Sequence, residues 1–200
     1  PQDAGKFSAL EECGKFASVL RTRVGSPYVI AGMQQALSKN ASSVVGFEAN
    51  GGLLLGSTIE KNGHELSALP TRDALLPILA CLSTTKETQK PLSEIARNYG
   101  FRIALSDRLQ NVAQEKTAAF LSVITQEEAR LRLFPLTDAV IRLETIDGVK
   151  LFFASGNAVH YRASGNAPEL RCYVEAATRE QAAELLTMGL EVARTVTKEA

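Results

Sequence analysis

The chain has 200 residues, 45% of them hydrophobic and 22% charged, so it is long enough to bury a core as one large domain or two small ones. Its 22 Lys and Arg residues balance 22 Asp and Glu residues, which excludes a general cationic surface for nucleic acid or an anionic membrane. Any anionic ligand must therefore be bound by a local site.

The cysteines and the apolar runs indicate where in the cell the protein is expected. Cys13, Cys81 and Cys172 are odd in number, far apart and without a C-x-x-C pair, which favours a reducing cytoplasm. The longest apolar run, residues 75–82, is interrupted by Pro77 and is too short to cross a bilayer. No basic region precedes an apolar stretch at the N-terminus, so we predict neither export nor membrane insertion.

Helix and strand patterns alternate in the first half of the chain. The apolar spacing predicts a helix over 7–20, a short strand and loop over 21–28, a helix over 29–37 and a buried strand over 43–47. A helix with no strand before it is an unusual start for an α/β domain, so we expect a segment upstream to be missing.

Turn signals follow the strand over 43–47. Asn50-Gly51-Gly52 predicts a hairpin into 53–55, and Lys61-Asn62-Gly63-His64 predicts a second one, because a type I′ turn needs positive φ at both central residues. A helix is expected over 71–82, with Thr71 as its cap and Asp73 in its first turn. The polar stretch 83–90 is a candidate tether, and we place the domains at 1–100 and 101–200.

The second half predicts an antiparallel sheet backed by helices on one face. Helical patterns cover 118–124 and 127–131, and strand patterns cover 139–145, 149–153, 158–162 and 170–175. Asp147-Gly148 is a hairpin turn, and Thr178 with Gln181 forms a capping box at the start of the last helix. The expected fold class is thus a partial α/β mixed-sheet domain followed by a small α+β domain.

A short repeat draws attention to one loop. Residues 154–158, Ala-Ser-Gly-Asn-Ala, recur as residues 163–167, and only the second copy is flanked by arginines, Arg162 and Arg171. Ser164 offers a hydroxyl, Gly165 and Asn166 can present backbone N–H groups, and two guanidinium forks can bind phosphate oxygens. On residue types alone, a polar loop with two surface arginines is an equal alternative.

The residues from Arg162 to Arg171, followed by Tyr173-Val174-Glu175-Ala176, closely resemble the C-terminal phosphate-binding loop of the α-D-phosphohexomutases, especially phosphomannomutases and phosphoglucomutases. Ala163 stands where the usual loop has Pro, a departure that affects rigidity more than ligand contact. Three further stretches resemble the same family in the expected order: residues 21–26, the sugar-recognition loop at 46–52, and residues 69–74.

The resemblance implies a four-domain enzyme of which this chain matches the third and fourth domains. In that family a phosphoserine exchanges its phosphoryl group with a hexose monophosphate through a bisphosphate intermediate, assisted by Mg²⁺. The chain contains neither a Ser-His-Asn-Pro string nor an Asp-Gly-Asp-x-Asp-Arg string. We therefore expect no catalytic residue and no metal ligand here, and an N-terminal half of the same enzyme as the partner. The alternative is a stand-alone, noncatalytic phosphosugar-binding protein.

The resemblance also assigns roles. Arg162, Ser164, Gly165, Asn166 and Arg171 would hold the phosphate of a hexose phosphate, while Glu48, Asn50 and Arg23 would contact the sugar. A carboxylate and an amide together accept from and donate to vicinal hydroxyls. Alternatively, Glu48 is an exposed hairpin charge, and Gly51 and Gly52 serve only the turn. Arg23 ranks before Arg21, which is equally compatible with a solvated charge on a strand. His64 and His160 are not assigned to the site.

Overall fold

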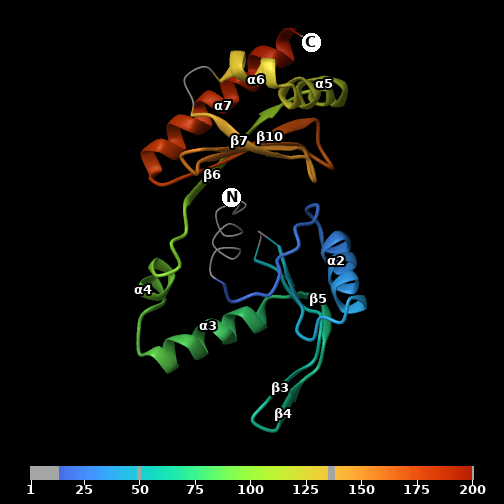
Figure 1. The fold of residues 1–200 in the computed structure, drawn as a ribbon, viewed down its shortest axis with the longest axis vertical. Helices are drawn as coiled ribbons and strands as arrows, with labels where there is room; N and C mark the ends of the chain where they lie inside the picture. Colours follow the sequence, from blue (N-terminus) through green and yellow to red (C-terminus); the bar gives the residue numbers. More distant parts are fainter. Residues whose placement is uncertain (1–13, 49–50, 135–137, 200) are drawn as a thin grey trace. The chain divides into compact units, whose positions relative to one another are not determined.

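The computed structural model describes residues 14–48, 51–134 and 138–199. It divides between Phe101 and Arg102 into two compact units, which we call the N-terminal and the C-terminal unit (Figure 1). Of the helices in the described ranges, none is both long and apolar enough for a bilayer.

The described residues of the N-terminal unit form two small antiparallel sheets and three helices. Strands β1 (Val45–Phe47), β2 (Leu53–Leu55) and β5 (Leu69–Asp73) form one sheet in the order β1-β2-β5. Strands β3 (Ile59–Lys61) and β4 (His64–Leu66) form a hairpin whose turn residues Asn62 and Gly63 have φ values of 53° and 76°. Both predicted hairpins are confirmed, since β1 pairs with β2 across the first. The helices are α2 (Ser26–Ser38), α3 (Leu75–Thr88) and α4 (Leu92–Arg97).

The start of this unit differs from the prediction. Residues 14–20 are irregular, so the helix expected over 7–20 does not reach Leu20, and its first part lies outside the described residues. Residues 21–25 are also irregular rather than a strand, and α2 begins at Ser26 with Pro27 in its first turn, where proline costs no hydrogen bond. A side chain at Gly46 would collide with Val29 and Met33 of α2, so glycine lets this helix lie against β1.

Helix α3 corrects two predictions. Its start is capped by Asp73, whose Oδ1 accepts from the N–H groups of Leu75 and Leu76 at 2.7 and 3.3 Å, and not by Thr71. The predicted tether over 83–90 is wrong, because residues 83–88 continue α3. Hydroxyls in this stretch donate to carbonyls one turn back, as Thr84 does to Ala80, so a polar composition is compatible with helix.

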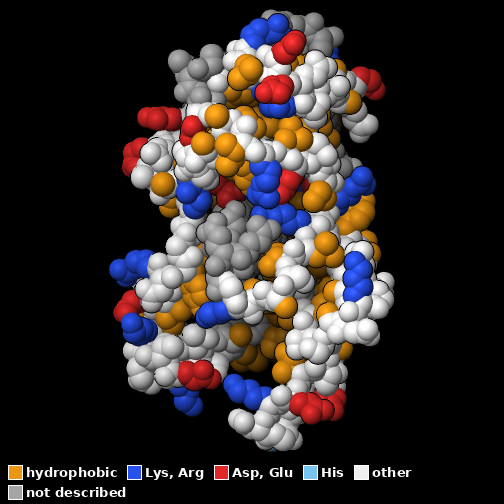
Figure 2. Space-filling model, viewed as in Figure 1, with side chains coloured by type: hydrophobic (Ala, Val, Ile, Leu, Met, Phe, Trp, Pro, Cys, Tyr) orange, Lys and Arg blue, Asp and Glu red, His pale blue; other side chains and the backbone are white. Residues whose placement is uncertain are grey.

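The apolar side chains of α3 are not covered. Leu75, Ile78, Leu79 and Leu82 are more than half exposed, and no residue of the helix is buried. Hydrophobic side chains are accordingly visible on the surface of the N-terminal unit (Figure 2). Its small core consists of Val29, Met33, Val44 and Leu54.

The C-terminal unit is a five-stranded antiparallel sheet with helices on one face (Figure 1). The strands are β6 (Ile103–Gln110), β7 (Val140–Glu144), β8 (Val149–Phe153), β9 (Ala158–Ala163) and β10 (Glu169–Ala176), in the order β6-β10-β9-β8-β7. The helices are α5 (Gln114–Thr125), α6 (Glu127–Leu133) and α7 (Arg179–Glu199). The predicted fold class is confirmed, but β6 was not predicted.

Alternation along the strands separates an apolar from a polar face. Val159 and Tyr161 of β9 and Cys172 and Val174 of β10 are at most 1% exposed and belong to the core that includes residues of α5 and α7. The Tyr161 hydroxyl donates to the carbonyl of Gly189 in α7 at 2.8 Å. The intervening positions carry polar and charged side chains toward the other face of the sheet.

Candidate functional site

Three arginines lie in register across three neighbouring strands of the C-terminal unit. Arg162 on β9 pairs with Arg171 on β10, which pairs in turn with Arg108 on β6. Directly opposite residues of antiparallel strands carry their side chains on the same face, about 5 Å apart, where like charges repel. We call these residues the arginine row. Such a row needs anions, either from the protein or from a ligand.

Two carboxylates supply part of that negative charge. Asp147 Oδ2 lies 3.2 Å from Arg162 Nη1. Glu169 bridges the other two arginines, with Oε1 at 3.1 Å from Arg108 Nε and Oε2 at 3.6 Å from Arg171 Nη2. Among the residues that the structure describes, these three guanidinium groups pair with two carboxylates, which leaves one positive charge in excess. The Arg162 side chain is only 11% exposed, so water screens its charge least.

Ser164 lies beside Arg162 on the same face. Its backbone N–H donates to the Glu169 carbonyl at 3.0 Å, which extends the pairing of β9 with β10 by one residue. The residue is 4% exposed. In the described part of the chain, neither Ser164 Oγ nor Arg162 Nε has a hydrogen-bond partner, although both atoms are buried. Buried polar atoms are nearly always paired, so this spot lacks an acceptor that an anion would provide.

The rest of the predicted loop is open to solvent. Gly165 and Asn166 are exposed, and a side chain built at Gly165 would meet no atom within 4 Å. The first copy of the repeat differs from the sequence prediction, which saw no charge near it. Arg102, distant in sequence, donates from Nη2 to Asn157 Oδ1 at 2.6 Å. Only the fold brings this cation to the first copy.

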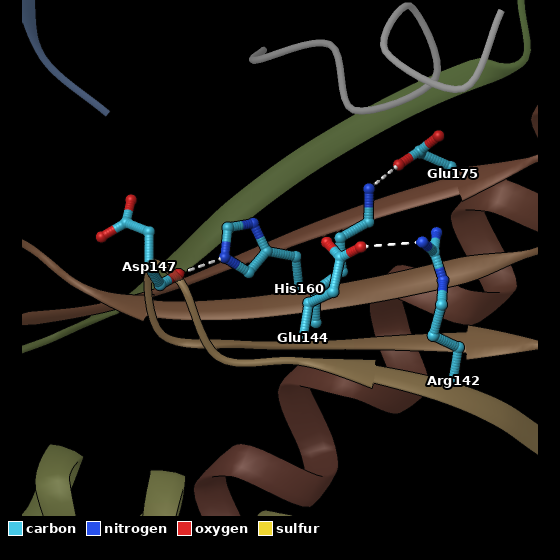
Figure 3. Close-up of polar contacts among 6 residues, drawn as sticks. Arg142, Glu144, Asp147, His160 and Glu175 are labelled. Carbon is cyan, nitrogen blue, oxygen red and sulfur yellow. Dashed lines mark hydrogen bonds and ion pairs between the residues drawn. The ribbon is translucent and has the colours of Figure 1, made fainter. Parts of the chain in front are cut away.

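His160 contacts the hairpin that carries Asp147. Its Nε2 lies 2.5 Å from the Asp147 carbonyl oxygen (Figure 3). Because a carbonyl only accepts, Nε2 is the nitrogen that donates. Burial lowers the pKa of His160 from 6.5 to about 4, helped by the nearby Lys150 and opposed by the Asp147 carbonyl. The ring is therefore neutral at pH 7.

Other charges on this face are paired with one another. Lys150 Nζ lies 2.6 Å from Glu175 Oε1, and the two side chains are 7% and 3% exposed (Figure 3). Arg142 Nη1 lies 2.9 Å from Glu144 Oε1. Both cations also lie over the Phe152 ring, at 4.7 Å for Lys150 Nζ and 3.7 Å for Arg142 Cζ. The excess positive charge thus lies in the arginine row rather than with these two cations.

A second cluster forms around Glu48 in the N-terminal unit. Its side chain is 7% exposed, so it is not the exposed hairpin charge of the alternative interpretation. Glu48 Oε1 accepts a hydrogen bond from Ser26 Oγ at the start of α2 and lies 3.9 Å from Arg72 Nε on β5. A side chain at Gly52 would lie 2.7 Å from Arg72 Nε, so this glycine makes room for the arginine.

The other two residues predicted to contact the sugar are Arg23 and Asn50. Arg23 is exposed and its guanidinium lies 5.8 Å from the centre of the Tyr28 ring. Asn50 lies outside the described residues. Ser26 and Arg72 were not predicted as site residues, although both fall in stretches that resemble the family. Arg108 was missed because β6 was not predicted, yet the alternation of Ile103, Leu105 and Leu109 was a usable signal.

The side chains of the described residues do not form a magnesium site. Within the ranges that the structure covers, no three His, Cys, Asp or Glu side chains gather to hold a metal ion. Mg²⁺ prefers carboxylate and water oxygens in an octahedral arrangement. We derive no step that uses a metal from these residues.

Two family models cover most of the chain. The model described as phosphoglucomutase/phosphomannomutase, alpha/beta/alpha domain III, matches residues 8–100, and the C-terminal domain model of the same family matches residues 103–191. The chain belongs to the phosphoglucomutase/phosphomannomutase family. The arginine row and Ser164 lie within the match to the C-terminal domain, and Glu48 lies within the match to domain III.

Curated relatives within this family include phosphomannomutases. The chain is 44% identical to one from Sinorhizobium fredii over 90% of its own length, and 40% identical to one from Salmonella muenchen over 86%. It spans only 38% and 36% of the lengths of these proteins. A phosphoglucosamine mutase from Oceanobacillus iheyensis is 28% identical over 88% of the chain and is covered over 32% of its length.

A solved structure has the same fold. A phosphoglucomutase/phosphomannomutase family protein from Burkholderia thailandensis aligns with a TM-score of 0.56 and 16% identity. The alignment covers 88% of this chain and 32% of that protein.

Proposed function

We propose that this chain is the sugar- and phosphate-binding part of a phosphohexomutase, most similar to phosphomannomutases, which interconverts hexose 6-phosphate and hexose 1-phosphate. The reaction proceeds through a phosphoserine and a bisphosphate intermediate. The serine and the Mg²⁺ ligands belong to an N-terminal half outside this chain, so the chain binds without catalysing. The unpaired Cys81 and Cys172 are compatible with a cytoplasmic location.

One observation carries the proposal: within the described ranges, the buried Ser164 Oγ and Arg162 Nε have no hydrogen-bond partner and lie beside a row with one positive charge in excess. Both atoms donate hydrogen bonds, and a phosphate offers several acceptor oxygens. Gly165 and Asn166 complete the loop. A site of this kind holds the phosphate that is not reacting, so its binding energy helps to position the reacting end of the sugar.

The Glu48 cluster is proposed to read the sugar. A carboxylate has about four lone-pair sites, so Glu48 can accept from vicinal hydroxyls while it keeps its contact with Ser26. Arg23 and Asn50 are the further sugar contacts of this proposal. The identity between this chain and two phosphomannomutases supports mannose phosphate as the first substrate to test.

The phosphate site is tested by titrating α-D-mannose 1-phosphate into the 200-residue chain and its variants. We expect Arg162→Ala and Arg171→Ala each to lose about 1.5–3 kcal/mol of binding free energy, as for hydrogen bonds to charged groups. Arg142→Ala is the matched control, because Arg142 is an arginine on the same sheet that is paired with Glu144. Equal affinities of the wild type, Arg162→Ala and Arg171→Ala would refute the phosphate site.

The sugar site is tested separately. We expect Glu48→Gln to change the preference between mannose 1-phosphate and glucose 1-phosphate more than it changes the affinity for inorganic phosphate. The reverse result would contradict the role of Glu48.

The upstream reading frame separates the two candidate functions. If it encodes the serine and magnesium loops, the stand-alone binding protein is excluded; if it begins near residue 1, the mutase proposal fails.

A further inference from the structure

The turn between β7 and β8 holds two residues of β9 through one aspartate. The Asp147 carboxylate binds Arg162 Nη1 at 3.2 Å, and the Asp147 carbonyl accepts from His160 Nε2 at 2.5 Å. His160 and Arg162 are two residues apart on one strand and therefore lie on the same face. Figure 3 shows the turn with the Asp147 carbonyl directed at the His160 ring. Asp147 is thus anchored at both its backbone and its side chain.

Gly148 allows the turn between β7 and β8 to lie close to the backbone of β9. Its φ is 80°, and a side chain there would lie 2.0 Å from the Tyr161 carbonyl oxygen and 2.8 Å from Arg162 Cα. Only glycine allows the turn to lie against the backbone of β9 at this point. The position of Asp147 relative to Arg162 is therefore fixed by backbone packing, before its carboxylate contributes.

The atoms used by Asp147 leave one edge of the guanidinium for a ligand. A guanidinium presents five N–H donors in a rigid plane, and its Nε and Nη2 donors point along one edge, suited to two phosphate oxygens. Asp147 binds Nη1, outside this edge, while Nε is buried and has no partner among the described residues. Ser164 Oγ is unpartnered in the same way.

We infer that Asp147 is a positioning residue for phosphate binding: it holds Arg162 by Nη1 so that the Nε edge is presented, with the Ser164 hydroxyl, to one phosphate group. The inference rests on the proposed function in that Arg162 is taken to bind phosphate. It also makes a prediction opposite to simple electrostatics. A carboxylate near an anion repels it, so Asp147 acting only as a charge would weaken phosphate binding.

The experiment compares Asp147→Asn with Glu144→Gln in titrations of the chain with α-D-mannose 1-phosphate. Each variant removes one negative charge from the same hairpin, but Glu144 forms its ion pair with Arg142, whereas Asp147 forms its ion pair with Arg162. We expect Asp147→Asn to weaken binding by about 3- to 10-fold, the equivalent of one hydrogen bond. Glu144→Gln should change the affinity less than about twofold.

A double-mutant cycle separates positioning from a general structural effect. In the Arg162→Ala background, Asp147→Asn should cause no further loss of affinity, because the side chain that it positions is gone and only the carboxylate's repulsion of the phosphate is relieved. A further loss of similar size in that background would overturn the inference, since it would mean that the turn supports the loop without Arg162. Thermal unfolding of each variant checks the fold, and Asp147→Ser, which also favours turns, is used if Asp147→Asn unfolds.

The possible failures are distinguishable. If the wild-type chain does not bind mannose 1-phosphate, or if Arg162→Ala binds as well as the wild type, the proposed phosphate site fails. If Arg162→Ala weakens binding while Asp147→Asn binds equally or more tightly, the phosphate site stands and the positioning role of Asp147 is wrong.

Discussion

Replacing Ser164 by alanine should stabilise the unligated protein and weaken its phosphate binding. The Ser164 hydroxyl is buried, and its Oγ has no partner in the described part of the chain. An unsatisfied buried hydroxyl costs about 1–3 kcal/mol, so its removal should raise the free energy of unfolding by about 1 kcal/mol after some loss of contacts. In a unit of about 100 residues this corresponds to a rise in Tm of roughly 4–8 °C.

If Ser164 binds phosphate as proposed, the same substitution also removes a hydrogen-bond donor to the ligand. One hydrogen bond is worth about 0.5–1.5 kcal/mol, so the affinity for mannose 1-phosphate should fall by about 3- to 10-fold. Stability is measured by urea unfolding without ligand, followed by the NMR signals of β9 and β10, and affinity by titration. Ser164→Thr, which keeps the hydroxyl, is the control. A destabilised Ser164→Ala variant would show that the hydroxyl has a structural partner, and an unchanged affinity would show that it does not bind phosphate.

Three further predictions concern the polar face of the same sheet. Lys150→Met should cost about 3–5 kcal/mol in urea unfolding, because it leaves the Glu175 carboxylate buried without its counter-ion, and the double variant with Glu175→Leu should recover most of this loss. Stability should fall by about 3 kcal/mol as the pH is lowered from 6.5 to 4, because unfolded His160 takes up a proton in this range and the folded ring does not; His160→Gln should remove this part of the dependence. Gly148→Ala should destabilise by at least about 2 kcal/mol, because its new methyl group collides with the Tyr161 carbonyl at a positive φ.

Each of these predictions has a contradicting result. If the double variant Lys150→Met, Glu175→Leu stayed as unstable as Lys150→Met, the cost would not come from an unpaired Glu175 carboxylate. An identical pH profile for the wild type and His160→Gln would mean that other groups cause the loss of stability. A normal melting curve for Gly148→Ala would mean that the turn has room to move away from β9.

Much of the fold could be predicted because local patterns coincide with it. Alternating apolar residues identified β8 and β9, the Asp147-Gly148 pair identified the turn between β7 and β8, and the Thr178 cap of α7 is present, with its Oγ1 accepting from the Gln181 N–H at 3.3 Å. β6 was missed because Asp107 stands where an apolar residue would continue the alternation of Ile103 and Leu105. In such segments, pairing with β10 overrides the local signal.

The helix α3 shows a different limit. The spacing of its apolar residues predicted a helix up to residue 82. The polar residues from 83 onward were interpreted as a linker, because serine and threonine are common in linkers, yet they continue the helix. Composition also did not reveal that Leu75 and Leu82 are exposed. Periodicity identifies a face of a helix, whereas what covers this face depends on tertiary structure.

Some residues of the candidate site could be predicted from the sequence and others could not. Sequence alone singled out Arg162, Arg171 and Ser164, because a family-like loop contains all three. Arg108 and the two carboxylates were not predicted, since their role depends on strand register rather than on spacing along the chain. Pairing of Arg171 with Arg108 across β6 and β10 is a contact between residues 63 positions apart.

The balance of charge in the arginine row is compatible both with folding and with the proposed binding of an anion. Three arginines side by side without counter-ions would repel one another, so Asp147 and Glu169 are needed for stability. Full neutralisation would leave nothing for a phosphate to gain. With two carboxylates for three guanidinium groups among the described residues, the row keeps one positive charge, and Nε of Arg162, the most buried of the three, has no partner there. A phosphate monoester supplies both the missing charge and the missing acceptor, whereas an uncharged sugar supplies neither, and we therefore expect mannose to bind this loop far more weakly than mannose 1-phosphate.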